Sequence, residues 1–295
     1  MEAFKELLKK IQKYEIRIRK ALNSQMQGDF HSIFKGSGLE FDDVRAYQYG
    51  DDVRTIDWIV SAKGHGTFVK TFREEKEQTV FFLVDLSKSQ EIGASGKQKI
   101  DLIKEITSVL AFSALHESSQ VGLIGYTDQK ELYIRPNKGK KQGYQLFGQL
   151  YKHVTQSPYT NLSKALNYTL NMLKRRSVVI LISDFIDDNY EHQLKAMARK
   201  HDLVVIRIHD ERESKLPRMG IIPLLDKESG KTIWRNTSSA DFRRNVSNMQ
   251  QEGAKHLEDL CKRYQASYVS IRTDEDYVPK LIKLFKVRNL SKKSV

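Results

Sequence analysis

The stretch Thr79 to Ser89 reads TVFFLVDLSKS, and it decides the fold. Its first half is a run of apolar and β-branched residues, which is typical of a central strand buried on both faces. The run ends abruptly in Asp85, Ser87 and Ser89. In open α/β sheets, binding sites form just beyond the carboxyl ends of the strands. The stretch therefore predicts both a core strand and a candidate site at its end.

A second apolar run, Ser177 to Ser183 (SVVILIS), repeats this design and ends in Asp184. A third covers Leu203 to Ile208, and segments with apolar residues at helical spacing lie between the runs. Val121 to Thr127 and Glu131 to Arg135 are strand candidates joined by a short polar turn, which indicates a hairpin-like edge. The alternation predicts an α/β fold, a Rossmann-like doubly wound and mostly parallel sheet with helices on both faces.

Three regions precede or interrupt this alternation. Residues 1–27 contain an amphipathic helix, for which we favour packing on its own domain over docking to a partner or a membrane surface. Residues 28–77 are expected to form a β-rich subdomain of short extended segments with glycine turns. Residues 78–290 then form the α/β domain, with an inserted β-hairpin at about 216–236.

The middle of the β-rich region mixes acidic, basic and aromatic residues in GLEFDDVRAYQYGDDVRTIDW. Buried charges survive folding only when they are paired, so the mixture predicts a hydrogen-bonded structural lattice. The same acids could bind a metal, but the arginines would compete with the ion.

The composition narrows the class of protein. The formal charge of +13 favours anionic partners, but the basic residues are scattered and not interleaved with aromatics, so a nucleic-acid site is not expected. No apolar run approaches the ~20 residues of a membrane span, and the chain does not open on a secretory signal, so we expect a cytoplasmic protein. The single Cys261 excludes an internal disulfide. The segment GASGK after the first strand fails the phosphate-loop pattern at Glu91 and Gln98.

Five oxygen-bearing side chains could converge at the strand ends. Asp85, Ser87 and Ser89 alternate along one loop, Thr160 stands at a predicted helix start, and Asp184 ends the neighbouring strand. Such ligands suit Mg²⁺ or Mn²⁺. Two carboxylates balance a divalent ion and leave a coordination position open for an acidic side chain of a partner protein. Two alternatives stay open: an ordinary helix cap for Thr160, and a hydrogen-bond network that holds no ion.

This set resembles the metal-ion-dependent adhesion site of von Willebrand factor A domains, in chain order and in secondary-structure context. The preceding block GSGLEFDDVRAYQYGDDVRTIDWIVSAK and the later LPRMGIIPLLDKESGKTIW are similar to the DUF58 family, over roughly Gly28 to Phe285. Gln90 stands where that family often has Met. The resemblance implies a bacterial protein that serves as partner or adaptor of a MoxR-type AAA+ ATPase in the assembly or maturation of other proteins.

The sequence therefore predicts a metal-dependent protein-interaction module with no catalytic residues. The first alternative is a magnesium-dependent phosphoryl hydrolase with Asp85 as the nucleophile, although no Lys or His is placed by a motif to assist it. The second is a binder of nucleic acid or anionic surfaces, motivated by charge alone.

Overall fold

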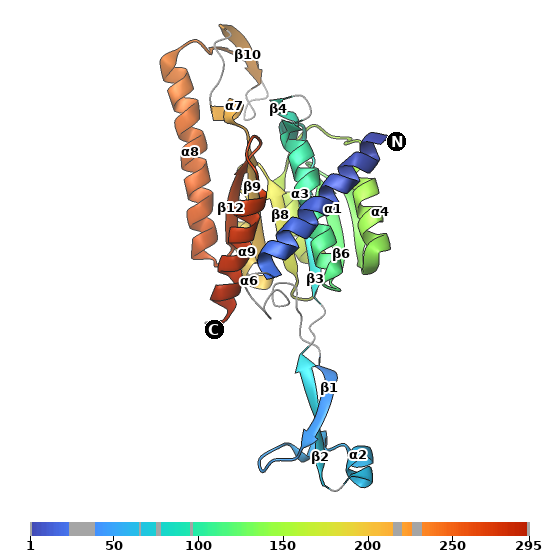
Figure 1. Cartoon of the computed structure of the whole chain (residues 1–295). Coiled ribbons are helices and arrows are strands. Elements are labelled where there is room, and N and C mark those ends of the chain that lie inside the picture. Colours follow the sequence, from blue (N-terminus) through green and yellow to red (C-terminus); the bar gives the residue numbers. More distant parts are fainter. Residues whose placement is uncertain are drawn as a thin grey trace.

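The computed structural model describes residues 2–23, 39–64, 66–74, 78–94, 97–214, 220–225 and 232–293. Its centre is a six-stranded sheet in the order β12-β9-β8-β3-β6-β7, and all neighbours are parallel except β6 and β7 (Figure 1). The strands are β3 (Thr79–Asp85), β6 (Gln120–Tyr126), β7 (Lys130–Asn137), β8 (Val178–Ser183), β9 (Asp202–His209) and β12 (Ser267–Arg272). The predicted doubly wound, mostly parallel α/β sheet with helices on both faces is confirmed.

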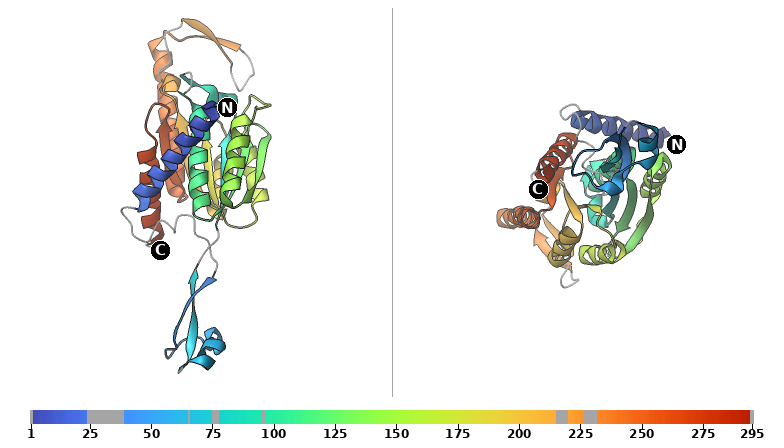
Figure 2. Two further views of the ribbon diagram at one scale, coloured as in Figure 1. Left: turned by 45° about the vertical axis from the view of Figure 1, so that its right-hand side comes forward. Right: turned by 90° about the horizontal axis from the view of Figure 1, so that it is seen from below.

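Helices cover both faces of the sheet (Figures 1 and 2). They are α1 (Glu2–Asn23), α3 (Lys99–His116), α4 (Gly139–Lys152), α5 (Leu162–Met172), α6 (Glu191–Lys200), α8 (Ala240–Arg263) and α9 (Val278–Lys293). Because side chains alternate along a strand, Phe82 and Val84 of β3 pack with α1, α3, α4 and α9, whereas Phe81 and Leu83 pack with α5, α6 and α8. Both layers of the core therefore meet on β3, which is why one apolar run organises the chain.

Helix α1 lies on its own domain, as expected. Ile11 is fully buried in the core layer that α3 and α9 share. Lys10 donates to Glu105 of α3 at 2.7 Å, and Arg17 donates to Asp276, just before α9, at 2.9 Å. Of the described side chains of the apolar stripe, Ile11 is buried by this chain and Leu8 is partly buried against the same core layer.

Strands β1 (Leu39–Ala46) and β2 (Phe68–Glu74) form an antiparallel hairpin beyond the amino ends of the sheet strands (Figure 1). The expectation of extended segments between them was wrong, because the connection holds a 3-10 helix, η2 (Val53–Thr55), and a short helix, α2 (Trp58–Lys63). The reason is local capping. The Asp57 carboxylate accepts from the backbone N–H of Ile59 and Val60 and so starts α2.

The predicted lattice of charges is present in part. Arg45 forms two hydrogen bonds with Asp51, at 2.7 and 2.8 Å, and Lys70 lies 3.6 Å from Asp57. These groups are exposed or half-buried, so the argument from buried charge was wrong, and the side chain of Trp58 is exposed as well. Residues 28–38, which were predicted to belong to the β-rich subdomain, lie outside the described residues.

The carboxyl ends of the sheet strands carry smaller elements (Figure 1). They are a 3-10 turn, η3 (Lys88–Glu91), the strand pair β4 (Gly93–Ala94) and β5 (Lys97–Gln98), the short helix α7 (Glu211–Ser214), and a hairpin of β10 (Ile221–Leu225) and β11 (Thr232–Asn236). That hairpin falls within the segment where an insertion was predicted. Among the described residues, no helix is both long and apolar enough to cross a membrane.

Candidate functional site at the carboxyl ends of β3 and β8

The candidate site lies where β3 and β8, paired in parallel, end side by side. Asp85 is the last residue of β3, and Ser183 is the last residue of β8, with Asp184 directly after it. The sheet register therefore brings the two predicted carboxylates to the same edge, as the sequence suggested. Both are buried, with 0% of Asp85 and 3% of Asp184 exposed.

Asp85 is the centre of a hydrogen-bond network. Its Oδ1 accepts from the backbone N–H of Ser87 at 3.0 Å and from the Ser87 hydroxyl at 2.7 Å. Its Oδ2 accepts from the Ser183 hydroxyl at 2.7 Å and from Nε2 of Gln90 at 3.1 Å. All these donors are neutral, so no cation of the described residues is hydrogen-bonded to this buried carboxylate.

Ser89 joins the same network. The hydroxyl oxygens of Ser87 and Ser89 lie 3.0 Å apart, and Nε2 of Gln90 donates to the Ser89 hydroxyl at 3.1 Å. Gln90 is fully buried and bridges two predicted ligands, a role that the sequence did not reveal. Its Oε1 has no hydrogen-bond partner in the structure. The hydroxyl and carboxylate oxygens of the D-x-S-x-S loop are therefore hydrogen-bonded within the loop and to Gln90. Among the described residues, Oε1 of Gln90 is the atom of this network that has no hydrogen-bond partner.

Asp184 is held by a lysine that the sequence did not point to. The Lys99 ammonium, at the start of α3, donates to Oδ2 of Asp184 at 2.7 Å, and it also donates to Glu213 of α7. Oδ1 of Asp184 accepts from the backbone N–H of Ile186 at 3.1 Å. Lys99 is fully buried. No motif marks this lysine, because the pairing joins residues far apart in sequence; the only hint is its place two residues after the GASGK segment.

The two carboxylates differ in their proton affinity. Burial, together with the negative charge of Asp184, raises the pKa of Asp85 to about 6, although its hydrogen bonds work in the opposite direction. Burial would also raise the pKa of Asp184, but the positive charge of Lys99, together with the hydrogen bonds from Lys99, Ile186 and Ser89, outweighs burial, so this pKa is lowered. Asp85 is thus the carboxylate whose charge lacks compensation.

Thr160 lies on the loop that leads into α5. Asn161, not Thr160, is the N-cap of α5, because its side chain accepts from the backbone N–H of Lys164 at 2.8 Å. The cap alternative for Thr160 was therefore wrong. The loop is placed beside the Asp85 loop, since the N–H of Lys88 donates to the carbonyl of Pro158 at 3.3 Å. Among the described residues, hydrogen bonds connect Asp85, Ser87, Ser89 and Asp184 to one another or to their neighbours. The Thr160 hydroxyl is not part of this network.

The buried carboxylate of Glu131 fixes this loop. It accepts from the backbone N–H groups of Gln156 and Ser157, each at 3.1 Å, and from the Thr127 hydroxyl at 2.9 Å. Glu131 was missed as well, because its predicted place on an edge strand gave no reason to expect burial.

A hard cation at this site would need hydroxyl oxygens as ligands in addition to the carboxylates. Within the described part of the chain, no three His, Cys, Asp or Glu side chains are grouped so that they could hold a metal ion. The site instead offers two carboxylates and the hydroxyls of Ser87, Ser89 and Ser183, which are oxygen ligands that suit Mg²⁺ or Mn²⁺.

Residues 43–256 match the family described as "Protein of unknown function DUF58". The chain belongs to the DUF58 family. Its relatives include the uncharacterized proteins Mb1516 of Mycobacterium bovis and Rv1480 of Mycobacterium tuberculosis. Each is 25% identical over 276 residues, which cover 91% of this chain and 86% of the relative.

Among solved structures, this DUF58 protein is similar to the conserved hypothetical protein BatB from Bacteroides thetaiotaomicron. The sequence identity is 13% and the TM-score is 0.46, over 71% of this chain and 97% of BatB.

Proposed function

We propose that this DUF58 protein is a metal-ion-dependent protein-interaction module. The observation that carries the proposal is the environment of Asp85. This fully buried carboxylate receives hydrogen bonds from neutral donors, lies near a second carboxylate, and has a raised pKa. A buried charge without a counter-charge is costly, and a divalent cation beside it would remove that cost.

Asp85, Ser87, Ser89, Thr160 and Asp184 would hold Mg²⁺ or Mn²⁺. Since Lys99 already binds Asp184, that carboxylate would act through Ser89, whose hydroxyl helps to lower the pKa of Asp184, or through water. When bound, the ion would supply an electrophilic position for an acidic side chain of a partner protein. The chain's own residues would supply the rigid frame of oxygen atoms around it.

A cavity of about 200 Å³ beside the site supports an acidic partner. It lies at the end of β6 and next to α5, and Tyr126, the sheet neighbour of Asp85, forms part of its wall. Lys130 and Lys164 also line it, with the Lys130 ammonium 5.3 Å from the centre of the Tyr168 ring. These lysines would attract a second acidic side chain of the same partner. By the family resemblance, the partner would be a MoxR-type AAA+ ATPase.

Metal binding is tested first by calorimetric titration of the purified protein with MnCl₂ and MgCl₂. We expect heat of binding for the wild type and its loss in Asp85→Ala. The matched control is Asp188→Asn, an exposed acid at the same edge of the sheet, which should bind as the wild type does. Absence of binding by the wild type would contradict the metal proposal.

Partner binding is tested by affinity capture from native extract, with magnesium or with a chelator. The wild type should retain a partner only with magnesium, and Asp85→Ala should retain none. Equal capture under both conditions would contradict the proposal. Asp184→Ala is a poor probe, because it also breaks the buried ion pair with Lys99 and would disturb the fold.

A phosphoryl hydrolase with Asp85 as nucleophile remains the second candidate. Lys99 brings a cation to the site, which favours it, but Asp184 and Glu213 already neutralise this ammonium. The side chains hydrogen-bonded to Asp85 are those of Ser87, Gln90 and Ser183, none of which is a good general acid at neutral pH. Release of phosphate from generic phosphomonoesters, abolished in Asp85→Ala, would support it.

A further inference from the structure

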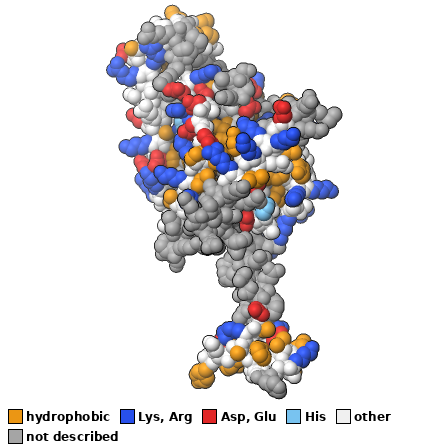
Figure 3. All heavy atoms as spheres, viewed as in Figure 1, with side chains coloured by type: hydrophobic (Ala, Val, Ile, Leu, Met, Phe, Trp, Pro, Cys, Tyr) orange, Lys and Arg blue, Asp and Glu red, His pale blue; other side chains and the backbone are white. Residues whose placement is uncertain are grey.

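The tip of the β1–β2 hairpin, residues 47–64, exposes an apolar surface. Trp58 and Ile59, at the start of α2, are each 70% exposed, and Val53 of η2 and Tyr49 are exposed as well. Figure 3 shows apolar side chains gathered at this end of the molecule. Single exposed apolar residues are ordinary, but several large ones on one short segment mark an interaction surface.

Few of the described side chains of the hairpin are buried. Neither η2 nor α2 contains a buried residue, and Val69 is the one buried apolar residue among the described side chains of β1, the tip and β2. An isolated two-stranded hairpin is marginally stable, and units of this size need further support. A partner surface that covers the four exposed apolar side chains would supply this support.

Charge identifies the kind of surface that would cover the tip. Residues 39–74 carry seven acidic and five basic side chains, a net charge of −2, whereas the whole chain carries +13. The rest of the molecule is therefore strongly basic. An anionic membrane would repel the hairpin, and a basic protein surface would attract it. A second copy of this chain presents such a surface.

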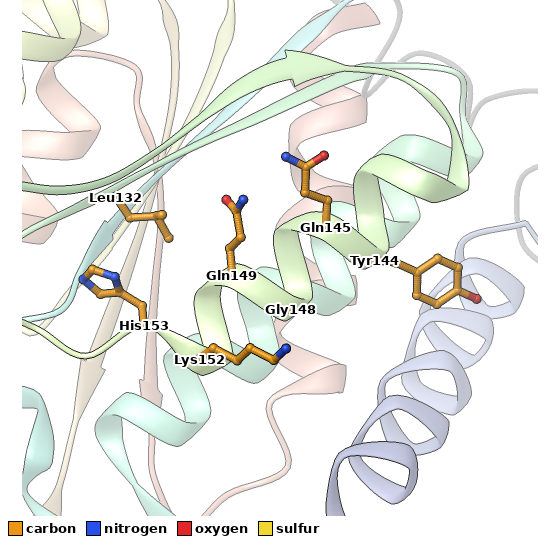
Figure 4. A pocket seen from close by; sticks show the side chains of 7 residues that line it. All are labelled: Leu132, Tyr144, Gln145, Gly148, Gln149, Lys152 and His153. Atoms are coloured by element: carbon orange, nitrogen blue, oxygen red, sulfur yellow. The ribbon is translucent and has the colours of Figure 1, made fainter. Parts of the chain in front are cut away.

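A shallow groove between β7 and α4 combines apolar side chains with basic ones, as a surface that covers the tip would need (Figure 4). It has a volume of about 450 Å³ and is lined by Leu132, Tyr144, Gly148 and Lys152, among others. Helix α4 contains three lysines and neither Asp nor Glu. Strand β7 is the edge of the sheet, so the groove is not covered by a further strand.

We propose that the tip of one copy docks into the β7–α4 groove of a second copy. Trp58 and Ile59 enter the groove, and the acidic residues of the tip face the lysines of α4. From their exposed fractions, the four apolar side chains offer on the order of 500 Å². Two reciprocal contacts would cover on the order of 1,000 Å² of tip surface, to which the surface covered on the partner adds, and specific interfaces bury a total of about 1,200–2,000 Å².

The proposal is tested by sedimentation velocity over a wide range of concentrations, at low salt and with a chelator, so that the candidate metal site plays no part. The tip variant carries Trp58→Glu and Ile59→Glu. The groove variant is Gly148→Trp, whose side chain enters space that is open in the single copy. The matched control is Gly253→Trp on α8, where the space around the glycine is equally open.

We expect the wild type and the control to self-associate, and each variant to weaken association at least tenfold while keeping the circular dichroism spectrum of the wild type. An equimolar mixture of the tip and groove variants should regain association, because it retains one intact tip and one intact groove. A wild type that stays monomeric, or a groove variant that associates normally, overturns the proposal. So does binding of the wild type to anionic phospholipid vesicles that requires the intact tip.

Discussion

Replacing Lys99 with Met tests how the charges of the candidate site are held. The Lys99 ammonium donates to Asp184 at 2.7 Å and also to Glu213. Methionine is also a long, unbranched side chain and removes the positive charge. Two buried carboxylates would then lie near each other without a cation between them.

The expected loss of stability is large because water does not reach these groups. The side chains of Lys99, Asp184 and Glu213 are 0%, 2% and 4% exposed. Removing one partner of a buried ion pair costs about 3–5 kcal/mol, because the remaining charge is left uncompensated. We expect Lys99→Met to lower the free energy of unfolding by that amount.

The assay is urea unfolding followed by circular dichroism. A second variant combines Lys99→Met with Glu213→Gln, and it should recover part of the loss, because it also removes one of the uncompensated carboxylates. The control is Lys10→Met, which breaks the half-exposed pair with Glu105 and should cost no more than about 1 kcal/mol. A loss below about 1 kcal/mol for Lys99→Met would refute the reasoning that this ammonium balances the site.

Three further predictions concern the stability of the α/β domain. Burial lowers the pKa of His201 to about 4, from about 6.5 when unfolded, so stability should fall as the pH drops below 6.5, by about 2 kcal/mol at pH 5. In urea unfolding at pH 7 and 5, His201→Gln should reduce this fall and His192→Gln, on the exposed side of α6, should not. Gly122→Ala places a Cβ 2.7 Å from the Phe81 ring and should cost about 1–3 kcal/mol of unfolding free energy; an unchanged melting temperature would contradict this. Asn161→Ala removes the cap of α5 and should cost about 1 kcal/mol, measured in the same way.

The sheet could be predicted from the sequence because its strands are continuous apolar runs. Buried on both faces, β3 and β8 need no alternation, so their ends are visible where the first polar residues appear. The same reasoning placed Asp85 and Asp184 at one edge. The strand order was not predicted, because β8 follows β7 in the sequence but pairs with β3.

Other features depended on contacts that no local pattern records. Helix α2 has six residues, too few for a periodic pattern, and only its cap at Asp57 marked it. Helix α8 is buried unevenly: Met249 in its first half is exposed, whereas its buried residues Leu257, Leu260 and Cys261 all lie in its second half. The pairing of Lys99 with Glu213 joins residues 114 positions apart.

The predicted metal ligands are held by two separate sets of contacts, and these sets would play different parts in binding a cation. Asp85 and Asp184 stand on ends of sheet strands, and Lys99 and Gln90 hold them in place. Thr160 instead stands on a loop that Glu131 fixes from the other side. A cation would therefore meet a preformed set of oxygen atoms at the ends of β3 and β8, and Thr160 would be supplied by a separately supported loop. Loss of the Glu131 carboxylate should consequently weaken metal binding while leaving the Asp85 network intact, which separates a positioning role from a ligand role.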